Sequence, residues 1–211
     1  MSVDKAYMEQ RDKGCYKKIF KNYKDPATRY AFAVLEGKIL AGNMIKLNAF
    51  RHLQDLRRID GDKDFKYIYD LTKCRAILNF AKLVPDVSMG KPLPLMLWQQ
   101  AILCLAQGWR DKKGEKRYSR VLFSVARTNG KTYLSNILLA YAYIVEADGL
   151  YNQDMAYIAP ITDQSQKGFA YITTTFNALA EIPAFKKEFK EKGITPLHDY
   201  VISRRTQNKL S

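Results

Sequence analysis

The first ninety residues carry apolar side chains at the three- and four-residue spacing of amphipathic helices. Asp25-Pro26 is typical of a helix start, because aspartate caps free N–H groups and proline is tolerated in the first turn. It precedes a run of helix formers over 27–35. Apolar residues recur every third position over 44–56, and helical spacing continues over 65–84 until a proline ends it. We therefore expect a helical region over residues 1–90.

A linker rich in glycine and proline, at 88–94, separates this region from the rest of the chain. One more amphipathic helix is expected after it, over 95–107, and Gly108 is expected to end that helix. These features predict a domain boundary near residue 90 and a second domain over 91–211.

Beyond residue 120 the pattern alternates between short apolar runs and helical periodicity. The run 121–126 is apolar and β-branched, as in the buried strands of parallel sheets, and 132–145 carries one apolar helical face. Strands and helices that alternate at this spacing are typical of βαβ units. The expected fold class is therefore α/β, with a parallel sheet in the second domain. Its other expected elements are strands at 153–159 and 200–203 and a helix at 163–179.

The composition is that of a globular protein with a strong positive charge. Hydrophobic residues make up 47% and charged residues 27% of the sequence, which excludes a largely disordered chain. The 35 Lys+Arg and 21 Asp+Glu give a formal charge of +14, with the excess spread along the sequence rather than gathered in a tail. This balance favours a polyanionic partner such as DNA, RNA or nucleotide, while a well-solvated surface explains it equally well.

Signals for a membrane, a secretory leader or a metal centre are missing from the sequence. The uncharged stretch with helical periodicity, 132–145, is shorter than the ~18–20 residues that cross a bilayer, and the N-terminus is charged. The three cysteines lack CxxC spacing, and neither His52 nor His198 has a partner at ligand spacing. We expect a reduced, cytoplasmic protein without a membrane partner, in which both histidines are structural.

The segment 125–132 reads Val-Ala-Arg-Thr-Asn-Gly-Lys-Thr and lies between an expected strand and an expected helix. This is the setting of a phosphate-binding loop, in which backbone N–H groups and a helix N-terminus face the phosphates. Gly130 lets the backbone approach the anion, Lys131 can reach the phosphates, and the Thr132 hydroxyl can bind Mg²⁺. Because Val125 stands where the usual loop has its first glycine, an ordinary strand-to-helix turn stays open as the alternative.

The variant loop resembles the Walker A motif of the large terminase subunit of tailed bacteriophages. These proteins are ATPases that drive DNA into the procapsid, and they carry a separate nuclease domain. Upstream, Leu97-Trp98-Gln99 resembles the adenine-recognition segment of the same family. The similarity extends over roughly residues 25–205, and it is specific around these two motifs. It implies an N-terminal helical region followed by an incomplete P-loop NTPase domain.

The resemblance implies ATP and Mg²⁺ as cofactors and assigns roles within the two motifs. Gln99 would hydrogen-bond adenine, with Trp98 packing beside it. Arg127 and Lys131 would be catalytic, because both cations can offset charge on the transferring phosphoryl group, and Thr132 would be the metal ligand. The implied cofactor-binding residues are Trp98, Gln99, Arg127, Thr128, Asn129, Gly130, Lys131 and Thr132.

Double-stranded DNA, the small terminase subunit and the portal are the partners that the resemblance implies, in the cytoplasm of the host cell. The acidic Walker B pair of the family is an Asp-Glu dipeptide, which occurs nowhere in the sequence, and no segment corresponds to the nuclease domain. We therefore expect a truncated chain that binds ATP and needs a complementing chain or a homo-oligomer for turnover. It would power DNA translocation only when complete.

Two alternatives stay open. One is a non-catalytic basic module or remnant that binds DNA or a partner protein without turnover. The other is an unrelated P-loop enzyme such as a small-molecule kinase, which would need acidic acceptor-binding groups in the same chain.

Overall fold

The computed structural model describes residues 2–147, 156 and 158–191, which pack as two compact units. The first unit takes in the residues up to Leu78 together with Leu95–Leu122, and the second takes in Asn79–Pro94 and the residues from Phe123 onward. The described residues are mostly helical, with a two-stranded sheet. None of their helices is both long and apolar enough to cross a membrane. The functional division at residue 90 stays a prediction.

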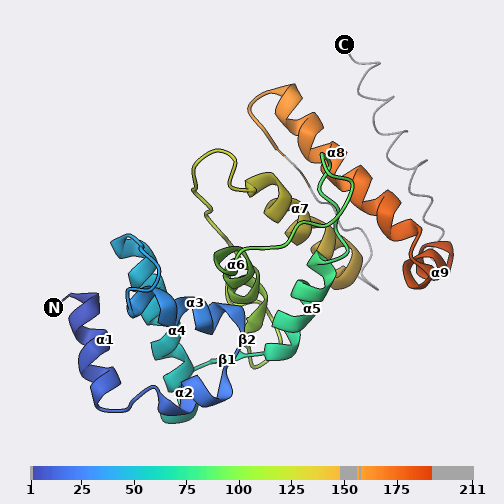
Figure 1. Ribbon diagram of the computed structural model, residues 1–211. Coiled ribbons are helices and arrows are strands. Elements are labelled where there is room, and N and C mark those ends of the chain that lie inside the picture. The colour runs from blue at the N-terminus through green and yellow to red at the C-terminus, as the bar shows by residue number, and fades with distance from the viewer. Residues whose placement is uncertain (1, 148–155, 157, 192–211) are drawn as a thin grey trace. The chain divides into compact units, whose positions relative to one another are not determined.

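Helices make up most of the first unit, which also contains a short antiparallel sheet (Figure 1). Helix α5 ends within the second unit. The elements are α1 (Val3–Asp12), α2 (Lys17–Asn22), α3 (Pro26–Leu35), α4 (Asn43–Gly61), β1 (Tyr67–Tyr69), α5 (Leu71–Ala81), α6 (Leu97–Gly108) and β2 (Trp109–Asp111).

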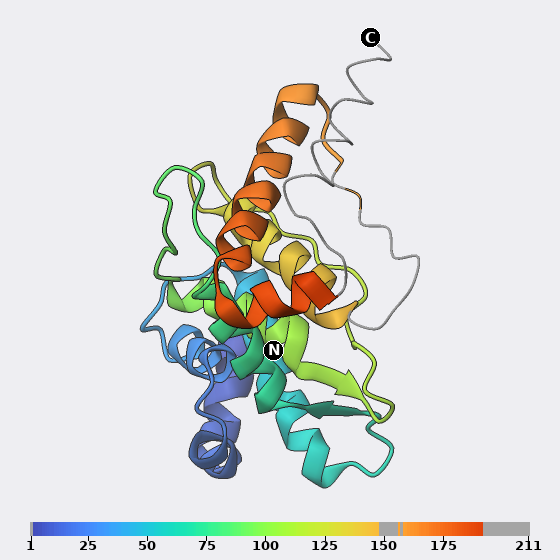
Figure 2. The ribbon, with the colours of Figure 1, turned by 90° about the vertical axis from the view of Figure 1, so that its right-hand side faces the viewer.

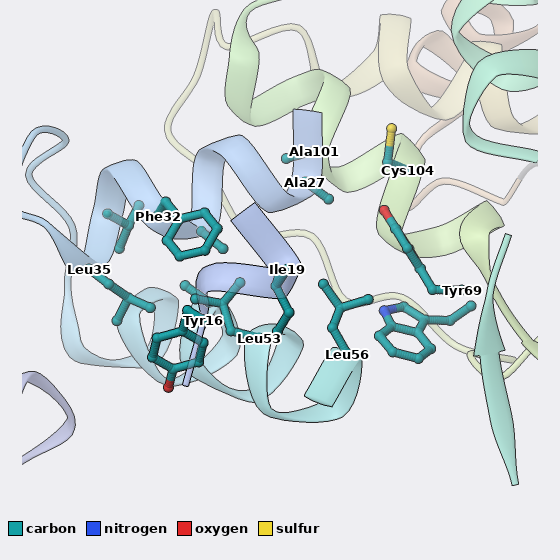
Figure 3. Packing of buried hydrophobic residues seen from close by; sticks show 14 of the residues in the cluster. Tyr16, Ile19, Ala27, Phe32, Leu35, Leu53, Leu56, Tyr69, Ala101 and Cys104 are labelled. Atoms are coloured by element: carbon teal, nitrogen blue, oxygen red, sulfur yellow. The ribbon is translucent and has the colours of Figure 1, made fainter. Parts of the chain in front are cut away.

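Helix α3 is the centre of the first unit and packs against both α4 and α6. It starts where the sequence predicted, because Asp25 Oδ1 accepts the N–H groups of Ala27 and Thr28 at 3.0 and 3.2 Å. Figure 3 shows side chains of these three helices meeting in one apolar core. Leu53 and Leu56 of α4 are fully buried there, and burial of each stabilises the fold by about 1.5–3 kcal/mol.

The apolar face predicted for α4 is only partly buried. Its C-terminal half supplies Leu53 and Leu56 to the core, whereas Met44 at its start is 78% exposed. Periodicity therefore placed the helix correctly but did not reveal how far the core extends along it.

The predicted helix over 65–84 is wrong in its first part. Tyr67–Tyr69 forms β1, which pairs antiparallel with β2 in the register Tyr67 to Asp111 and Tyr69 to Trp109 (Figure 2). The helix begins only after Asp70, whose Oδ1 accepts the N–H of Thr72 at 2.7 Å. Aspartate at this position ends the strand and caps the helix, so two elements share what reads as a single helical pattern.

Beyond Phe123, the described part of the second unit contains three helices and one π-helical turn. These are α7 (Lys131–Tyr141), η1 (Ala142–Glu146), α8 (Thr162–Ala180) and α9 (Pro183–Glu191). Helix α7 packs on α8, and α8 packs on α9 (Figures 1 and 2). Leu134, Ile137 and Tyr141 of α7 are buried, as the apolar face of the predicted helix required. The helix expected at 163–179 is confirmed as α8.

The strand expected at 121–126 is not formed, and Leu122 within it is 97% exposed. A strand needs hydrogen bonds to a neighbour, and the other two expected strands, 153–159 and 200–203, lie mostly or wholly outside the described residues. Within the described residues the sheet is the antiparallel pair β1–β2, so the α/β character there is limited to this pair and its helices.

Candidate nucleotide-binding loop

The chain makes a tight turn immediately before α7. Thr128 and Gly130 have φ values of 67° and 71°, in the left-handed region. Glycine adopts this region freely, but a β-branched threonine does so at a cost of about 1–3 kcal/mol. The Thr128 hydroxyl donates to the Arg127 carbonyl at 2.5 Å, and Asn129 Nδ2 donates to the carbonyls of Ala126 and Arg127 at 3.3 and 3.2 Å. The side chains of the turn thus hold a strained backbone in place.

Positive charge gathers where this turn meets α7. Gly130 is the N-cap of the helix, and Lys131 is its first residue. The first N–H groups of a helix have no intrahelical acceptor and carry a partial positive charge. The first turn of α7 contains no acidic residue that could neutralise it. Arg127 and Lys131 are both exposed beside it, so the turn has the groups that an anion-binding site needs.

Lys131 folds back over the turn, where its Nζ donates to the Val125 carbonyl at 3.2 Å. The half-buried Thr132 follows in the first turn of α7. The structure therefore brings the predicted residues Arg127 to Thr132 together in one turn and one helix start. Because an ammonium group has three N–H donors, Lys131 has donors left for a phosphate beside the Val125 carbonyl.

Tyr133, the next residue, was missed by the sequence reasoning. Its buried hydroxyl donates to the Val84 carbonyl at 2.7 Å and accepts the Leu93 N–H at 3.2 Å. Burial is the main cause that raises its pKa, so the hydroxyl stays neutral and able to donate at physiological pH. No local pattern marks these contacts, because the partners lie 49 and 40 positions away along the chain.

Trp98 and Gln99 belong to the first unit and lie at the start of α6. Gln99 is 8% exposed, and its Oε1 accepts the N–H of Met96 at 2.9 Å. This contact caps the helix, so Gln99 has a structural role. The predicted role toward adenine requires that the same side-chain amide also contacts the base. Trp98 is half-buried beside it in sequence.

His52 is part of a buried polar network in the first unit. Trp109 Nε1 donates to His52 Nδ1 at 3.2 Å, so Nε2 carries the proton and donates to Thr28 Oγ1 at 3.1 Å. Burial lowers the pKa of His52 to about 4, and the ring stays neutral. These contacts show a structural role for His52, as the sequence predicted. His198 lies outside the described residues.

One cluster in the described residues has the geometry of metal ligands. Atoms of Asp25, Cys74 and Cys104 lie within 4.8 Å of one another. However, both Asp25 oxygens already accept hydrogen bonds, one of them from the Tyr69 hydroxyl at 2.7 Å. Cys74 Sγ donates to the Cys104 carbonyl. A side-chain hydrogen bond with Cys74, followed by burial, raises the pKa of the Cys104 thiol. The cluster is therefore a helix cap beside two buried core cysteines, and we assign no metal to it.

A family model described as the terminase large subunit, ATPase domain, matches residues 97–208, more than half of the 211 residues. The chain belongs to this family. The matched part of this terminase chain begins at the first residue of α6 and contains Trp98, Gln99 and the whole turn before α7. No match was found among curated proteins or among solved structures.

Family membership confirms the resemblance that the sequence motifs indicated. It supports a DNA-packaging ATPase role with nucleotide use at the level of the family. The roles of individual residues rest on the loop geometry and on the sequence.

Proposed function

We propose that this terminase chain binds Mg-ATP through Arg127 to Thr132 and takes part in ATP-driven packaging of double-stranded DNA. The carrying observation is the turn before α7, where Arg127 and Lys131 flank a helix N-terminus that lacks acidic residues. The left-handed Thr128 and Gly130 keep this turn in place, and the whole turn lies inside the terminase ATPase match.

The triphosphate would lie against the first N–H groups of α7, contacted also by Thr128, Asn129 and Gly130. Lys131 would donate to a phosphate oxygen, which gives a stronger, charge-assisted hydrogen bond than the neutral Val125 carbonyl does. The Thr132 hydroxyl would hold Mg²⁺ together with the phosphate oxygens, and the ion would neutralise their charge. The exposed Arg127 guanidinium can offset the charge that develops during phosphoryl transfer.

Adenine recognition is assigned to Gln99, with Trp98 packing beside the base. We also propose that residues 91–211 belong to an ATPase domain of the P-loop class and residues 1–90 to a helical N-terminal region. The sequence contains no Asp-Glu dipeptide. The carboxylate that orients the attacking water would then come from outside these 211 residues, from a complementing chain or another copy.

The nucleotide site is tested by titrating the chain with Mg-ATP in a calorimeter, next to Lys131→Ala. Loss of the charge-assisted contact should weaken binding about 10- to 100-fold, as expected for about 1.5–3 kcal/mol. Lys167→Ala, on the exposed surface of α8 in the same unit, is the matched control and should bind like the parent. The parent should also prefer ATP to GTP if Gln99 reads the base.

Equal binding by the parent and Lys131→Ala would refute the loop assignment. A phosphate-release assay on the same samples separates binding from turnover. Hydrolysis by the chain alone would show that it holds a catalytic carboxylate, against our proposal.

A second candidate function, a basic module that binds DNA without turnover, is favoured by a surface of the first unit. Residues 11–24 carry six of the 18 basic residues of the 1–90 region but only one of its 11 acidic residues. All six basic side chains are exposed, and Phe20 among them is 61% exposed. The six residues are Arg11, Lys13, Lys17, Lys18, Lys21 and Lys24.

We name these six residues the α2 basic surface, and we propose it as a contact for duplex DNA. The sequence shows this surface when basic and acidic residues are counted over short windows. The total excess of positive charge is spread along the chain and does not reveal it. The small terminase subunit, the portal and further copies of the chain are the other proposed partners, in the host-cell cytoplasm. Binding to DNA that ignores ATP would favour the module over the motor ATPase.

A further inference from the structure

The segment 84–93 forms a closed loop in the second unit. Asp86 N–H donates to the Lys91 carbonyl at 3.0 Å, and the Gly90 N–H donates to the Asp86 carbonyl at 2.8 Å. Asp86 Oδ1 accepts the N–H groups of Ser88 and Met89 at 2.9 and 3.2 Å. These internal contacts give the segment a defined conformation. A displacement of its ends is therefore expected to move the whole segment.

Two tyrosines fasten this loop to two different helices. Tyr133 of α7 bonds both of its ends, through the Val84 carbonyl and the Leu93 N–H. Tyr171 of α8 donates to Asp86 Oδ2 at 2.9 Å and so holds the loop near its start. Tyr133 is 3% exposed and Asp86 is 7% exposed, so these bonds are largely shielded from water. Loss of either hydroxyl would leave a buried partner without its hydrogen bond, which destabilises the loop.

The two tyrosines differ in their relation to the nucleotide loop. Tyr133 lies in the first turn of α7, two residues after Lys131, whereas Tyr171 belongs to α8. A phosphate that binds Lys131 becomes a further acceptor beside the Val125 carbonyl, so nucleotide binding changes the contacts of this first turn. The phosphate would also lie against the first backbone N–H groups of α7, and the same turn carries Tyr133, so a shift of this turn moves the Tyr133 hydroxyl.

We propose that Tyr133 is a positioning residue that transmits phosphate binding at Lys131 to the segment 84–93 through its two hydrogen bonds. The inference rests on the proposed nucleotide function of the loop. The segment is followed at Leu97 by α6, the helix that carries Gln99. Phosphate binding is thus coupled along the chain to the helix proposed to recognise the base.

Hydrogen–deuterium exchange tests this coupling, with Mg-ATP as the probe and peptides covering 84–93 and 126–132 as the readout. In the parent, Mg-ATP should slow exchange in both peptides. In Tyr133→Phe, Mg-ATP should slow exchange at 126–132 but should no longer slow it at 84–93. A purely structural role of Tyr133 would change basal exchange but not this response to nucleotide.

Tyr171→Phe is the matched control. It removes a hydrogen bond to the same loop, but the lost hydroxyl belongs to α8 and leaves the sequence of α7 unchanged. It should raise basal exchange at 84–93 and keep the response to Mg-ATP. Equal nucleotide-dependent protection at 84–93 in Tyr133→Phe and the parent would overturn the inference. Absence of protection at 126–132 in the parent would instead refute the nucleotide function on which it rests.

Inorganic pyrophosphate with Mg²⁺ provides a second probe that lacks the base. Because the proposed signal starts at Lys131, pyrophosphate should also protect 84–93 in the parent and in Tyr171→Phe. Protection of 84–93 by ATP but not by pyrophosphate, at concentrations that protect 126–132 equally, would show that the signal starts at the base and would overturn the inference.

Discussion

His52 makes the stability of the first unit depend on pH. Its pKa is lowered from 6.5 to about 4, first by burial and then by the charge of Arg117, while Asp25 acts in the opposite direction. The unfolded chain therefore binds a proton between these values that the folded chain does not bind. Stability is full above pH 6.5 and is lost as the pH falls toward 4.

From these values we expect His52 alone to lower the free energy of unfolding by about 2 kcal/mol between pH ~7 and pH ~5. Urea unfolding at the two pH values measures this difference. His52→Asn, which keeps a hydrogen-bond acceptor for Trp109, should be less stable at neutral pH but should lose less stability on acidification. The same pH dependence in both proteins would mean that His52 is not the responsible group.

Thr128 shows at the scale of one residue why the loop differs from an ordinary turn. A threonine with φ of 67° is unfavourable by itself, and the hydrogen bond from its hydroxyl to the Arg127 carbonyl compensates only part of the cost. The sequence predicted that residues 127–132 act together. It did not predict this conformation, because threonine rarely adopts it.

At the scale of elements, the packing at the end of α6 requires a residue without a side chain at position 108. The sequence predicted Gly108 as the end of the helix, and the structure confirms it as the last helical residue. Its importance lies in packing, because a Cβ there would lie 2.5 Å from Cys74 Sγ and 2.6 Å from Tyr69 Cε2. Helix α5 and strand β1 therefore approach the backbone of α6 as closely as only glycine permits.

Gly108→Ala should destabilise the protein by about 1–3 kcal/mol through this overlap. Gly61→Ala is the matched control at the end of α4, where a Cβ would meet nothing within 4 Å. That change should be neutral or stabilising by up to about 1 kcal/mol. Thermal unfolding of both variants measures the difference, and equal effects would contradict the close packing at Gly108.

The pair β1–β2 shows the limit of periodicity as a guide to elements. Tyr67 to Tyr69 continue the helical spacing of the residues after them, yet they pair with Trp109 to Asp111. The pairing partner lies about forty residues away, and a short window of sequence contains no information about it. The structure shows that Asp70 caps α5, and the strand pairing shows that it separates two elements.

At the scale of the whole molecule, the charge of +14 predicts that binding to duplex DNA weakens steeply with salt. If the α2 basic surface makes the contact, Lys17→Ala/Lys21→Ala should reduce the slope of log K against log salt by about 2. The control Lys63→Ala/Lys66→Ala removes the same charge from exposed sites elsewhere in the first unit. Equal loss in both variants would mean that net charge, and not this surface, determines affinity.

The sequence by itself determined the features that depend on neighbouring residues. It predicted α3 with its Asp25 cap, α6 and α8 with their approximate bounds, and the terminase family, while the phosphate-binding role of 125–132 stays a prediction. Caps, helical periodicity and phosphate loops are formed by residues close together in the chain, so their signals are local.

Only the tertiary structure decided the features formed between distant segments. These are the β1–β2 pair, the close contact at Gly108, and the Tyr133 hydroxyl that joins α7 to Val84 and Leu93. Each depends on which surfaces meet when the chain folds. Side-chain periodicity shows that a face is apolar, but not which partner will bury it.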